Sequence, residues 1–178
     1  SCNNAAFNAV QFNHSASVKT VNANCDLPLG NNPTITDDVI AAGTLSGTGT
    51  LTTNSAAAFT INATGALNGF SGLVANGALT LSGSTIDLSA YTTVDLNSTF
   101  TLSSSAVFTA PAGSMTLAGN FTHSSGTTFN HGNGTVVLDG NDQTLSGAAT
   151  DFYNLTKTVS SNYTLTLPAG VTTTVANM

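Results

Sequence analysis

Short apolar alternations recur along the chain from about residue 33 to its end. Each copy spans roughly three to five residues and is separated from the next by Gly, Ser, Asn or Asp. Alternation with a period of two over so few residues is typical of a short strand that buries one face. No segment has helical periodicity, so the sequence predicts an all-β fold. The recurring phrase is Thr-apolar-x-Leu, found at Thr85–Leu88, Thr93–Leu96, Thr99–Leu102 and Thr135–Leu138.

The spacing of these copies favours a solenoid over a sandwich. Copies lie roughly 6 to 21 residues apart, which suits a coil of about 20 residues that carries two or three short strands. A β-sandwich or jelly roll, the alternative, more often has strands of about five to six residues at intervals of about 8–12 residues. We therefore predict a β-solenoid, with about six or seven coils of about 20 residues each.

The composition limits the partners that the chain can bind. Charged residues make up 6% of the chain, and its cationic side chains are Lys19 and Lys157. Phosphate binding needs several Lys or Arg side chains close together, so we exclude nucleic acid. Anionic membranes are excluded for the same reason, and no apolar run reaches the about 20 residues of a membrane-spanning helix. Hydrophobic residues, at 40%, are sufficient for a folded core.

The polar residues are typical of exported surface proteins. Ser, Thr, Asn, Gly and Ala are abundant, and the pI is about 4.3. The sequence also opens at Ser1 without an initiator Met or a basic, apolar leader, which is expected of an already processed product. We therefore expect an extracellular, cell-surface location.

The N-terminal part of the sequence differs from the repeats. We predict a cap segment at residues 1–32 and β-solenoid repeats over residues 33–178. Both cysteines, Cys2 and Cys25, lie in the cap segment, and an even count in an exported chain indicates a disulfide. It would close a loop of about 23 residues and stabilise the fold by about 3 kcal/mol. Two free thiols are the alternative.

The same segment carries two stretches of strand-like alternation, at residues 5–12 and 17–21. They indicate a hairpin-like structure pinned by the disulfide. A solenoid needs such a cap, because its first coil otherwise exposes a row of unpaired backbone donors and acceptors.

Three phrases near the C-terminus are distinctive: Gly126–Gly140 (GTTFNHGNGTVVLDG), Gln143–Gly147 (QTLSG) and Phe152–Val159 (FYNLTKTV). Together they resemble a module of very large bacterial secreted surface proteins with filamentous-haemagglutinin-like β-helices. The resemblance covers about residues 110–178, and residues 33–110 are similar to the Gly-Thr-Leu repeats that precede such modules. It implies a right-handed parallel β-helix on the cell surface, with a role in adhesion or matrix, and supplies no catalytic residues. Whether the chain is a small subunit or a fragment of a long protein stays open.

Carboxylates offer three candidate sites. Asp87 and Asp95 lie at the same position of two similar tetrapeptides, Thr-Ile-Asp-Leu and Thr-Val-Asp-Leu, and are expected to point away from the core. Paired carboxylates can hydrolyse glycosides. The alternative that we favour is that both are solvated surface residues. The turn Asp139–Asp142 is rich in oxygen, and Asp37 and Asp38 are adjacent. Calcium needs six to eight oxygen ligands, whereas Asx and Gly residues simply favour turns. We therefore expect no bound metal.

The histidines and hydroxyl residues are also interpreted as structural. His123 and His131 flank a turn without the further ligands that zinc needs, and we expect them, like His14, to be polar surface or turn residues. No Gly-x-Ser-x-Gly elbow supports a hydrolase triad. We therefore expect no enzymatic activity and no cofactor.

Two kinds of repeated tripeptide remain. Asn-x-Ser/Thr sequons permit N-glycosylation but occur about as often as chance predicts in such a chain. Thr-x-Thr tripeptides could order water against ice if they were aligned between coils, but their spacing is uneven. The sequons begin at Asn13, Asn62, Asn97, Asn120, Asn133, Asn154 and Asn162, and the Thr-x-Thr tripeptides include those that begin at Thr34, Thr48, Thr156, Thr164 and Thr172.

These features favour a structural protein. We expect a self-associating subunit of a surface filament, pilus-like fibre or fibrous adhesin, which contacts copies of itself by end-to-end stacking or strand exchange. The alternative is an adhesin module that binds carbohydrates or a receptor without polymerising. A polysaccharide-degrading β-helix and an ice-binding protein are the less favoured hypotheses.

Overall fold

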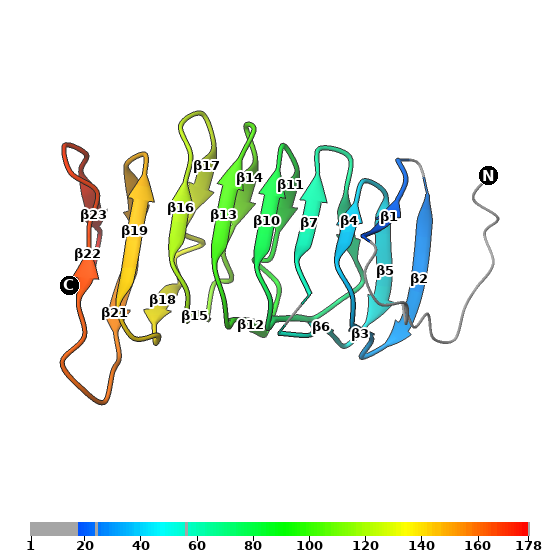
Figure 1. The fold of residues 1–178 in the computed structure, drawn as a ribbon, viewed down its shortest axis with the longest axis horizontal. Coiled ribbons are helices and arrows are strands. Elements are labelled where there is room, and N and C mark those ends of the chain that lie inside the picture. Colours follow the sequence, from blue (N-terminus) through cyan, green and yellow to red (C-terminus); the bar gives the residue numbers. More distant parts are fainter. Residues whose placement is uncertain (1–17, 24, 56, 178) are drawn as a thin grey trace.

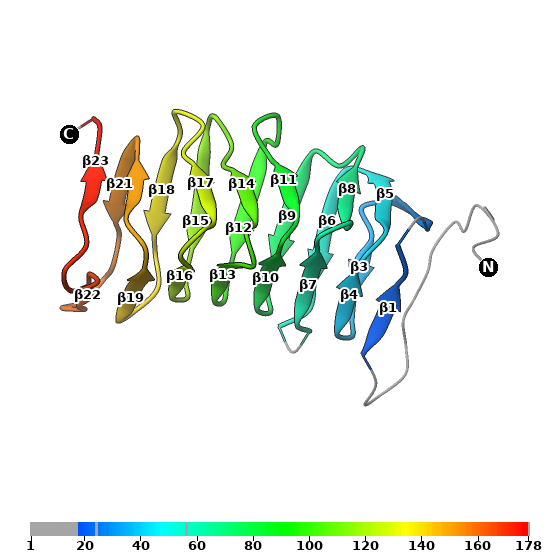
Figure 2. The ribbon, with the colours of Figure 1, turned by 90° about the horizontal axis from the view of Figure 1, so that it is seen from above.

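The computed structural model describes residues 18–23, 25–55 and 57–177. These residues form a parallel β-solenoid of about seven turns without any helix. Strands of successive coils lie side by side along a rod, with the N-terminal coil at one end and the C-terminal coil at the other (Figures 1 and 2). The predicted solenoid is confirmed, and the sandwich alternative is wrong.

Each complete coil passes through three faces in the same order. Face one is a continuous parallel sheet of eight strands. It consists of β1 (Lys19–Val21), β4 (Val39–Ala41), β7 (Phe59–Asn62), β10 (Leu79–Ser82), β13 (Phe100–Ser103), β16 (Phe121–His123), β19 (Gln143–Gly147) and β22 (Leu165–Thr166).

Face two follows face one in every coil and is divided into three short parallel sheets. The first contains β2 (Asp26–Asn31), β5 (Thr44–Thr48) and β8 (Ala66–Asn68); the second contains β11 (Thr85–Asp87), β14 (Val107–Thr109) and β17 (Thr128–Asn130); the third contains β20 (Thr150–Phe152) and β23 (Thr173–Val175).

Face three closes each coil and is a parallel sheet of seven strands. Its strands are β3 (Thr34–Ile35), β6 (Thr50–Thr53), β9 (Gly72–Ala75), β12 (Thr93–Leu96), β15 (Ser114–Leu117), β18 (Thr135–Leu138) and β21 (Asn154–Lys157).

In-register pairing stacks equivalent side chains in columns inside the rod. One buried column on face one has steps of 20, 20, 21, 21 and 24 residues, which confirms a coil of about 20 residues; its members are Val39, Phe59, Leu79, Phe100, Phe121 and Leu145. The alternate residues of each strand face outward, so the apolar positions of the short alternations supply the core. Full burial of each large apolar side chain stabilises the fold by about 1.5–3 kcal/mol.

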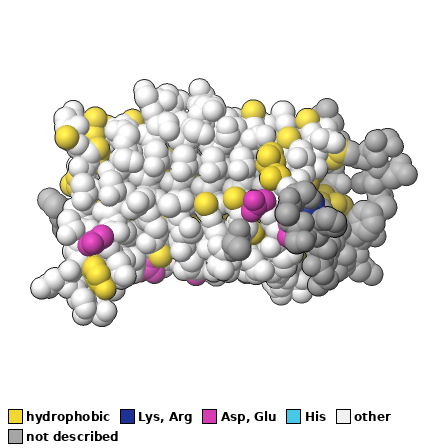
Figure 3. Space-filling view, viewed as in Figure 1, with side chains coloured by type: hydrophobic (Ala, Val, Ile, Leu, Met, Phe, Trp, Pro, Cys, Tyr) yellow, Lys and Arg dark blue, Asp and Glu magenta, His cyan; other side chains and the backbone are white. Residues whose placement is uncertain are grey.

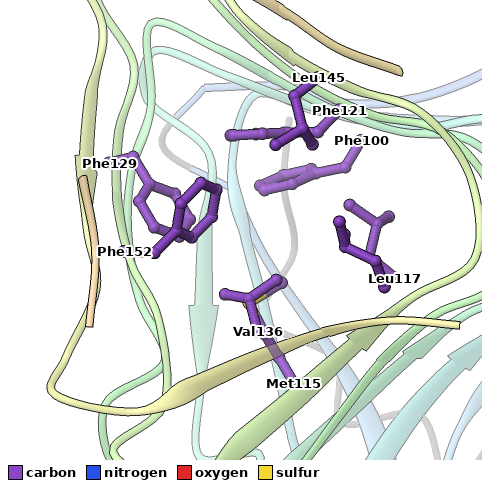
Figure 4. Close-up of a pocket in the computed structure, with 9 residues that line it drawn as sticks. Phe100, Met115, Leu117, Phe121, Phe129, Val136, Leu145 and Phe152 are labelled. Carbon is purple, nitrogen blue, oxygen red and sulfur yellow. The ribbon is translucent and has the colours of Figure 1, made fainter. Parts of the chain in front are cut away.

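The C-terminal half of the core is filled by aromatic rings. Phe100 stacks on Phe121 with a centroid distance of 5.3 Å, and Phe108 stacks on Phe129 at 5.8 Å. Phe129 also contacts Phe152 at 5.4 Å. Figure 4 shows Phe100, Phe121, Phe129 and Phe152 pointing into the same interior space. The space left between them is about 10 Å³ and is lined by apolar side chains, so this interior has no room for a ligand.

The described part of the predicted cap segment belongs to the solenoid. Strands β1 and β2 pair in parallel with β4 and β5 of the next coil, and Val21 and Leu29 are buried in the same core. Cys25 packs against that core. Cys2 and the alternation over residues 5–12 lie outside the described residues, so the Cys2–Cys25 disulfide and the hairpin-like cap stay predictions.

A membrane-spanning helix is not found in the part of the chain that the structure describes.

One buried hydroxyl lacks a hydrogen-bond partner. The side chain of Thr53 points inward from β6 and is fully buried, and its Oγ1 atom contacts no donor or acceptor among the described residues. A buried hydroxyl without a partner costs about 1–3 kcal/mol relative to its hydration in the unfolded chain.

We expect Thr53→Val to stabilise the protein by about 1 kcal/mol, because valine has nearly the same shape and needs no partner. The measurement is the free energy of unfolding from denaturant titration. Thr52→Val, at the half-buried outward position of the same strand, is the control and should have little effect. Destabilisation by Thr53→Val would contradict this account of the interior.

Candidate functional site

At each end of the described part of the rod, the strands pair with a neighbour on one side only. Strands β21, β22 and β23 are the last strands of their sheets, and no described residue pairs with their outer edges. The backbone N–H and C=O groups on those edges are a template for a further strand. At the opposite end, β1, β2 and β3 are the first strands of their sheets.

Exposed large apolar side chains gather at the same ends. Among the described residues, Val159, Tyr163, Leu167 and Val171 are 36–51% exposed, and all four lie in the C-terminal coil. Val18, which is 53% exposed, directly precedes β1. In Figure 3 most of this side of the rod is covered by backbone and uncharged polar side chains; apolar side chains are visible at its C-terminal end and also over its N-terminal half. These residues are called the end patches below.

A half-buried lysine lies at the end of the last complete coil. Lys157 on β21 pairs in register with Leu138, so it extends the inward column that contains Ala75, Leu96, Leu117 and Leu138 in the four preceding coils. Its Nζ atom donates to the carbonyl oxygens of Gly140 and Asn141 at 2.5 and 2.8 Å, and to Oε1 of Gln143 at 2.5 Å. The Nε2 atom of the buried Gln143 donates to the carbonyl of Leu117 at 2.8 Å.

The contacts of Lys157 explain the oxygen-rich turn at Asp139–Asp142. The backbone oxygens of Gly140 and Asn141 are directed at the ammonium group of Lys157. Asp142 accepts a hydrogen bond from the backbone N–H of Thr164 at 2.7 Å. Within the described ranges no group of three or more metal-ligating side chains occurs. The turn is therefore organised around the protein's own cation, which the sequence pattern did not reveal.

The structure separates Asp87 from Asp95. Asp87 is exposed on face two, and its Oδ1 atom accepts the backbone N–H of Ser89 at 2.8 Å; this hydrogen bond lowers the pKa of the Asp87 carboxyl. Asp95 lies on face three, where it accepts hydrogen bonds from Thr116 at 2.6 Å and Asn97 at 3.0 Å. The two carboxylates have different partners on different faces, so they do not form a shared acid–base site.

An open groove of about 360 Å³ lies beside Asp95 on face three. Hydroxyl, amide and carboxylate groups predominate in its lining, and Asp95 and Asp139 supply the charge. Neither a basic nor an aromatic side chain lines it. The groove is formed by Thr92, Thr93, Val94, Asp95, Asn97, Ser114, Thr116 and Asp139.

The prediction for His123 was wrong. This residue is 6% exposed and pairs in register with the buried Leu102, so it lies in an inward column rather than in a surface turn. Its Nδ1 atom lies 2.9 Å from Oγ1 of Thr150, and its Nε2 atom lies 3.2 Å from the carbonyl oxygen of Thr127. Both ring nitrogens are thus satisfied by the protein, as a structural histidine requires.

His131 matches the prediction of a turn residue. Its Nδ1 atom accepts the backbone N–H of Asn133 at 2.9 Å, and its ring lies 5.6 Å from that of Tyr153. His14 lies outside the described residues.

The sequon asparagines differ in their surroundings. Asn97, Asn120 and Asn154 have side-chain hydrogen bonds to neighbouring coils. Asn62 is half-buried at the end of β7, whereas Asn133 and Asn162 are exposed in connecting segments. Asn13 lies outside the described residues. If a glycosylating host makes the protein, Asn133 and Asn162 are the most accessible acceptors.

The predicted Thr-x-Thr sites do not form an array, because they are spread over different faces and connecting segments. A threonine column that was not predicted does exist. It lies on the outer side of face one in four successive coils and consists of Thr60, Thr80, Thr101 and Thr122. Each of these threonines is followed two residues later by Asn or Ser, which is why a search for Thr-x-Thr missed it.

No family model matches this chain, and neither a curated protein nor a solved structure is significantly similar to it.

We expect Lys157→Met to destabilise the C-terminal coil by about 1.5–3 kcal/mol, because three oxygens lose a charged donor. The substitution keeps a long apolar stem in the column. Hydrogen exchange of residues 138–158 and thermal unfolding would measure the effect. Thr156→Met, at the exposed neighbouring position of β21, is the control. Equal stability of the two variants would contradict a structural role for the ammonium group.

Proposed function

We propose that this protein is an extracellular structural subunit that stacks end to end with copies of itself in a surface filament or fibrous adhesin. The observation that carries the proposal is the coincidence of open sheet edges with the end patches. Apolar side chains that are exposed together are typical of interaction sites, and here they lie beside backbone groups that can accept a further strand.

The strands at the two ends of the rod have the same direction, so the sheets of one copy could be continued by those of another. All three faces are parallel sheets with the same strand direction in every coil, so the edge of the last coil presents the pattern that the first coil of another copy can continue. Contact between two different ends is heterologous, and such contacts generate open filaments when they do not close into a ring. The occupant that we propose for the C-terminal edge is therefore a second copy.

The remaining features agree with a structural role outside the cell. A chain with 6% charged residues has little electrostatic repulsion between copies. We propose the right-handed winding that parallel crossover connections almost always have, which also agrees with the resemblance to filamentous-haemagglutinin-like modules. We propose no catalytic activity and no cofactor.

We expect the purified chain to form fibres, and Val171→Asp to prevent them, because a carboxylate in the C-terminal end patch must be desolvated on stacking. Electron microscopy and sedimentation velocity would measure assembly. Val107→Asp places the same charge on the side of the rod, at the half-buried outward position of β14, and should leave the fibres intact.

Mixing two variants tests whether the ends are complementary. Val18→Asp should block the N-terminal end, and Val171→Asp should block the C-terminal end. Because each variant keeps one intact end, an equimolar mixture should give dimers although neither variant forms fibres alone. Wild-type protein that remains monomeric, or a mixture that remains monomeric, would contradict end-to-end stacking.

The groove beside Asp95 favours a second candidate function, the binding of a neutral glycan. Its hydroxyl, amide and carboxylate groups can donate to and accept from sugar hydroxyls. We expect retention of the protein on a polysaccharide resin, and its loss in Ser114→Tyr, which fills the groove. Thr85→Tyr on face two is the control. Unretarded elution of the wild-type protein would exclude this candidate.

A further inference from the structure

The corner that follows face three carries a ladder of side-chain amides. In successive coils the equivalent residues are Asn76, Asn97, Ala118 and Asp139, since each donates its backbone N–H to the carbonyl oxygen of the last inward residue of the preceding coil. Nδ2 of Asn76 donates to the carbonyl oxygen of Thr53 at 2.8 Å, and Nδ2 of Asn97 donates to Oδ1 of Asn76 at 2.9 Å. Each amide thus satisfies an acceptor of the coil before it.

The ladder is interrupted at Ala118, which has no amide to donate. By the pattern of the ladder, Oδ1 of Asn97 faces this coil, and it accepts no hydrogen bond from another described residue. The exposed carboxylate of Asp139, in the following coil, has no hydrogen-bond partner within the described ranges either. Neighbouring coils lie about 4.8 Å apart, so a gap with acceptors on both sides is left at Ala118.

The groove on face three adjoins this gap, because Asp95, Asn97 and Asp139 all line it. The carboxylate of Asp95 is held by Oγ1 of Thr116 at 2.6 Å and by Nδ2 of Asn97 at 3.0 Å. Both donors are uncharged, so the negative charge of Asp95 is not neutralised by them. No lysine lines the groove, and Lys157 donates to three other oxygens. The groove therefore presents acceptors and negative charge without a cation of its own.

We infer that the groove binds an amino sugar, whose ammonium group lies in the gap beside Ala118. There the ammonium group takes the place of the missing amide. One N–H donates to Oδ1 of Asn97, and the others are directed at the carboxylates of Asp95 and Asp139. Hydrogen bonds between an ammonium group and a carboxylate are roughly twice as strong as those between neutral groups, so the amine gains more than a sugar hydroxyl would gain at the same place.

The rest of the lining favours a sugar over other amines. The hydroxyl groups of Thr92, Thr93, Ser114 and Thr116 also line the groove, and a hydroxyl can both donate to and accept from the hydroxyls of a sugar ring. A lysine side chain has a long apolar stem, for which this polar lining offers little cover. The inference rests on the second candidate function, glycan binding in this groove, and names the class of glycan that the groove prefers.

Calorimetric titration with two soluble ligands tests this preference. Oligomers of glucosamine carry ammonium groups at slightly acidic pH, whereas oligomers of N-acetylglucosamine of the same length carry neutral amides. We expect the glucosamine oligomer to bind at least about tenfold more tightly, which is the difference that one charged hydrogen bond makes. Added salt should weaken its binding and leave that of the acetylated oligomer unchanged.

Two substitutions should remove the preference. Asp139→Asn deletes a carboxylate without a side-chain partner among the described residues, so the fold should not be disturbed. Ala118→Asn supplies the missing amide, which would donate to Oδ1 of Asn97 and fill the gap. Each should lower the affinity for the glucosamine oligomer about tenfold. The matched controls are Asp26→Asn, which removes an exposed carboxylate on face two, and Ala149→Asn, at an exposed corner; neither should change binding.

The outcomes separate this inference from the glycan candidate. Equal affinity for the two oligomers, with both lost in Ser114→Tyr, would overturn the inference while glycan binding stands. A preference for glucosamine that survives Asp139→Asn or Ala118→Asn would overturn the proposed position of the ammonium group. A lysine oligopeptide that binds as tightly as the glucosamine oligomer would overturn the sugar as the ligand. Failure of both oligomers to bind would also overturn the inference, and retention on the polysaccharide resin still decides the glycan candidate independently.

Discussion

Parallel, in-register pairing of each strand with the strand one coil away is the constraint on which the rest of this structure depends. It places equivalent residues about 4.8 Å apart along the rod, so the character of a position is shared by a whole column. An interior column must be apolar in almost every coil, as in the series from Val39 to Leu145. An outward column is free to be polar, which is how a chain with so few charges keeps a hydrated side surface.

The strands were predictable because their inward residues are apolar within a single short phrase. The face to which each strand belongs could not be predicted, because the phrase Thr-apolar-x-Leu occurs on all three faces. Its copies at Thr85–Leu88, Thr93–Leu96 and Thr99–Leu102 correspond to β11 on face two, β12 on face three and β13 on face one. Copies therefore recur up to three times in a coil. Their uneven spacing reflects the lengths of the corners rather than the length of the coil.

Polar residues in the interior show where local reasoning fails. His123 lies in a sequence of hydroxyl residues and Gly, which favours a turn, but its register with Leu102 places it inside. Lys157 follows the same rule, since pairing with Leu138 brings its stem into the core. What decides burial in a solenoid is the column, and a column can be identified only when the lengths of the coils are known. The step of 24 residues between Phe121 and Leu145 conceals it from any fixed repeat.

The position of Lys157 on β21, the last strand of face three, affects whether a further strand could pair there. Lysine on an edge strand normally discourages pairing, because its charge must stay hydrated. Here the ammonium group of Lys157 already has three oxygen partners within the rod, so a new strand need not strip it of water. Only its apolar stem is left at the edge for a neighbouring strand to cover. The edge of β21 thus carries a lysine whose charge does not oppose pairing, because that charge is already satisfied by the protein's own oxygens.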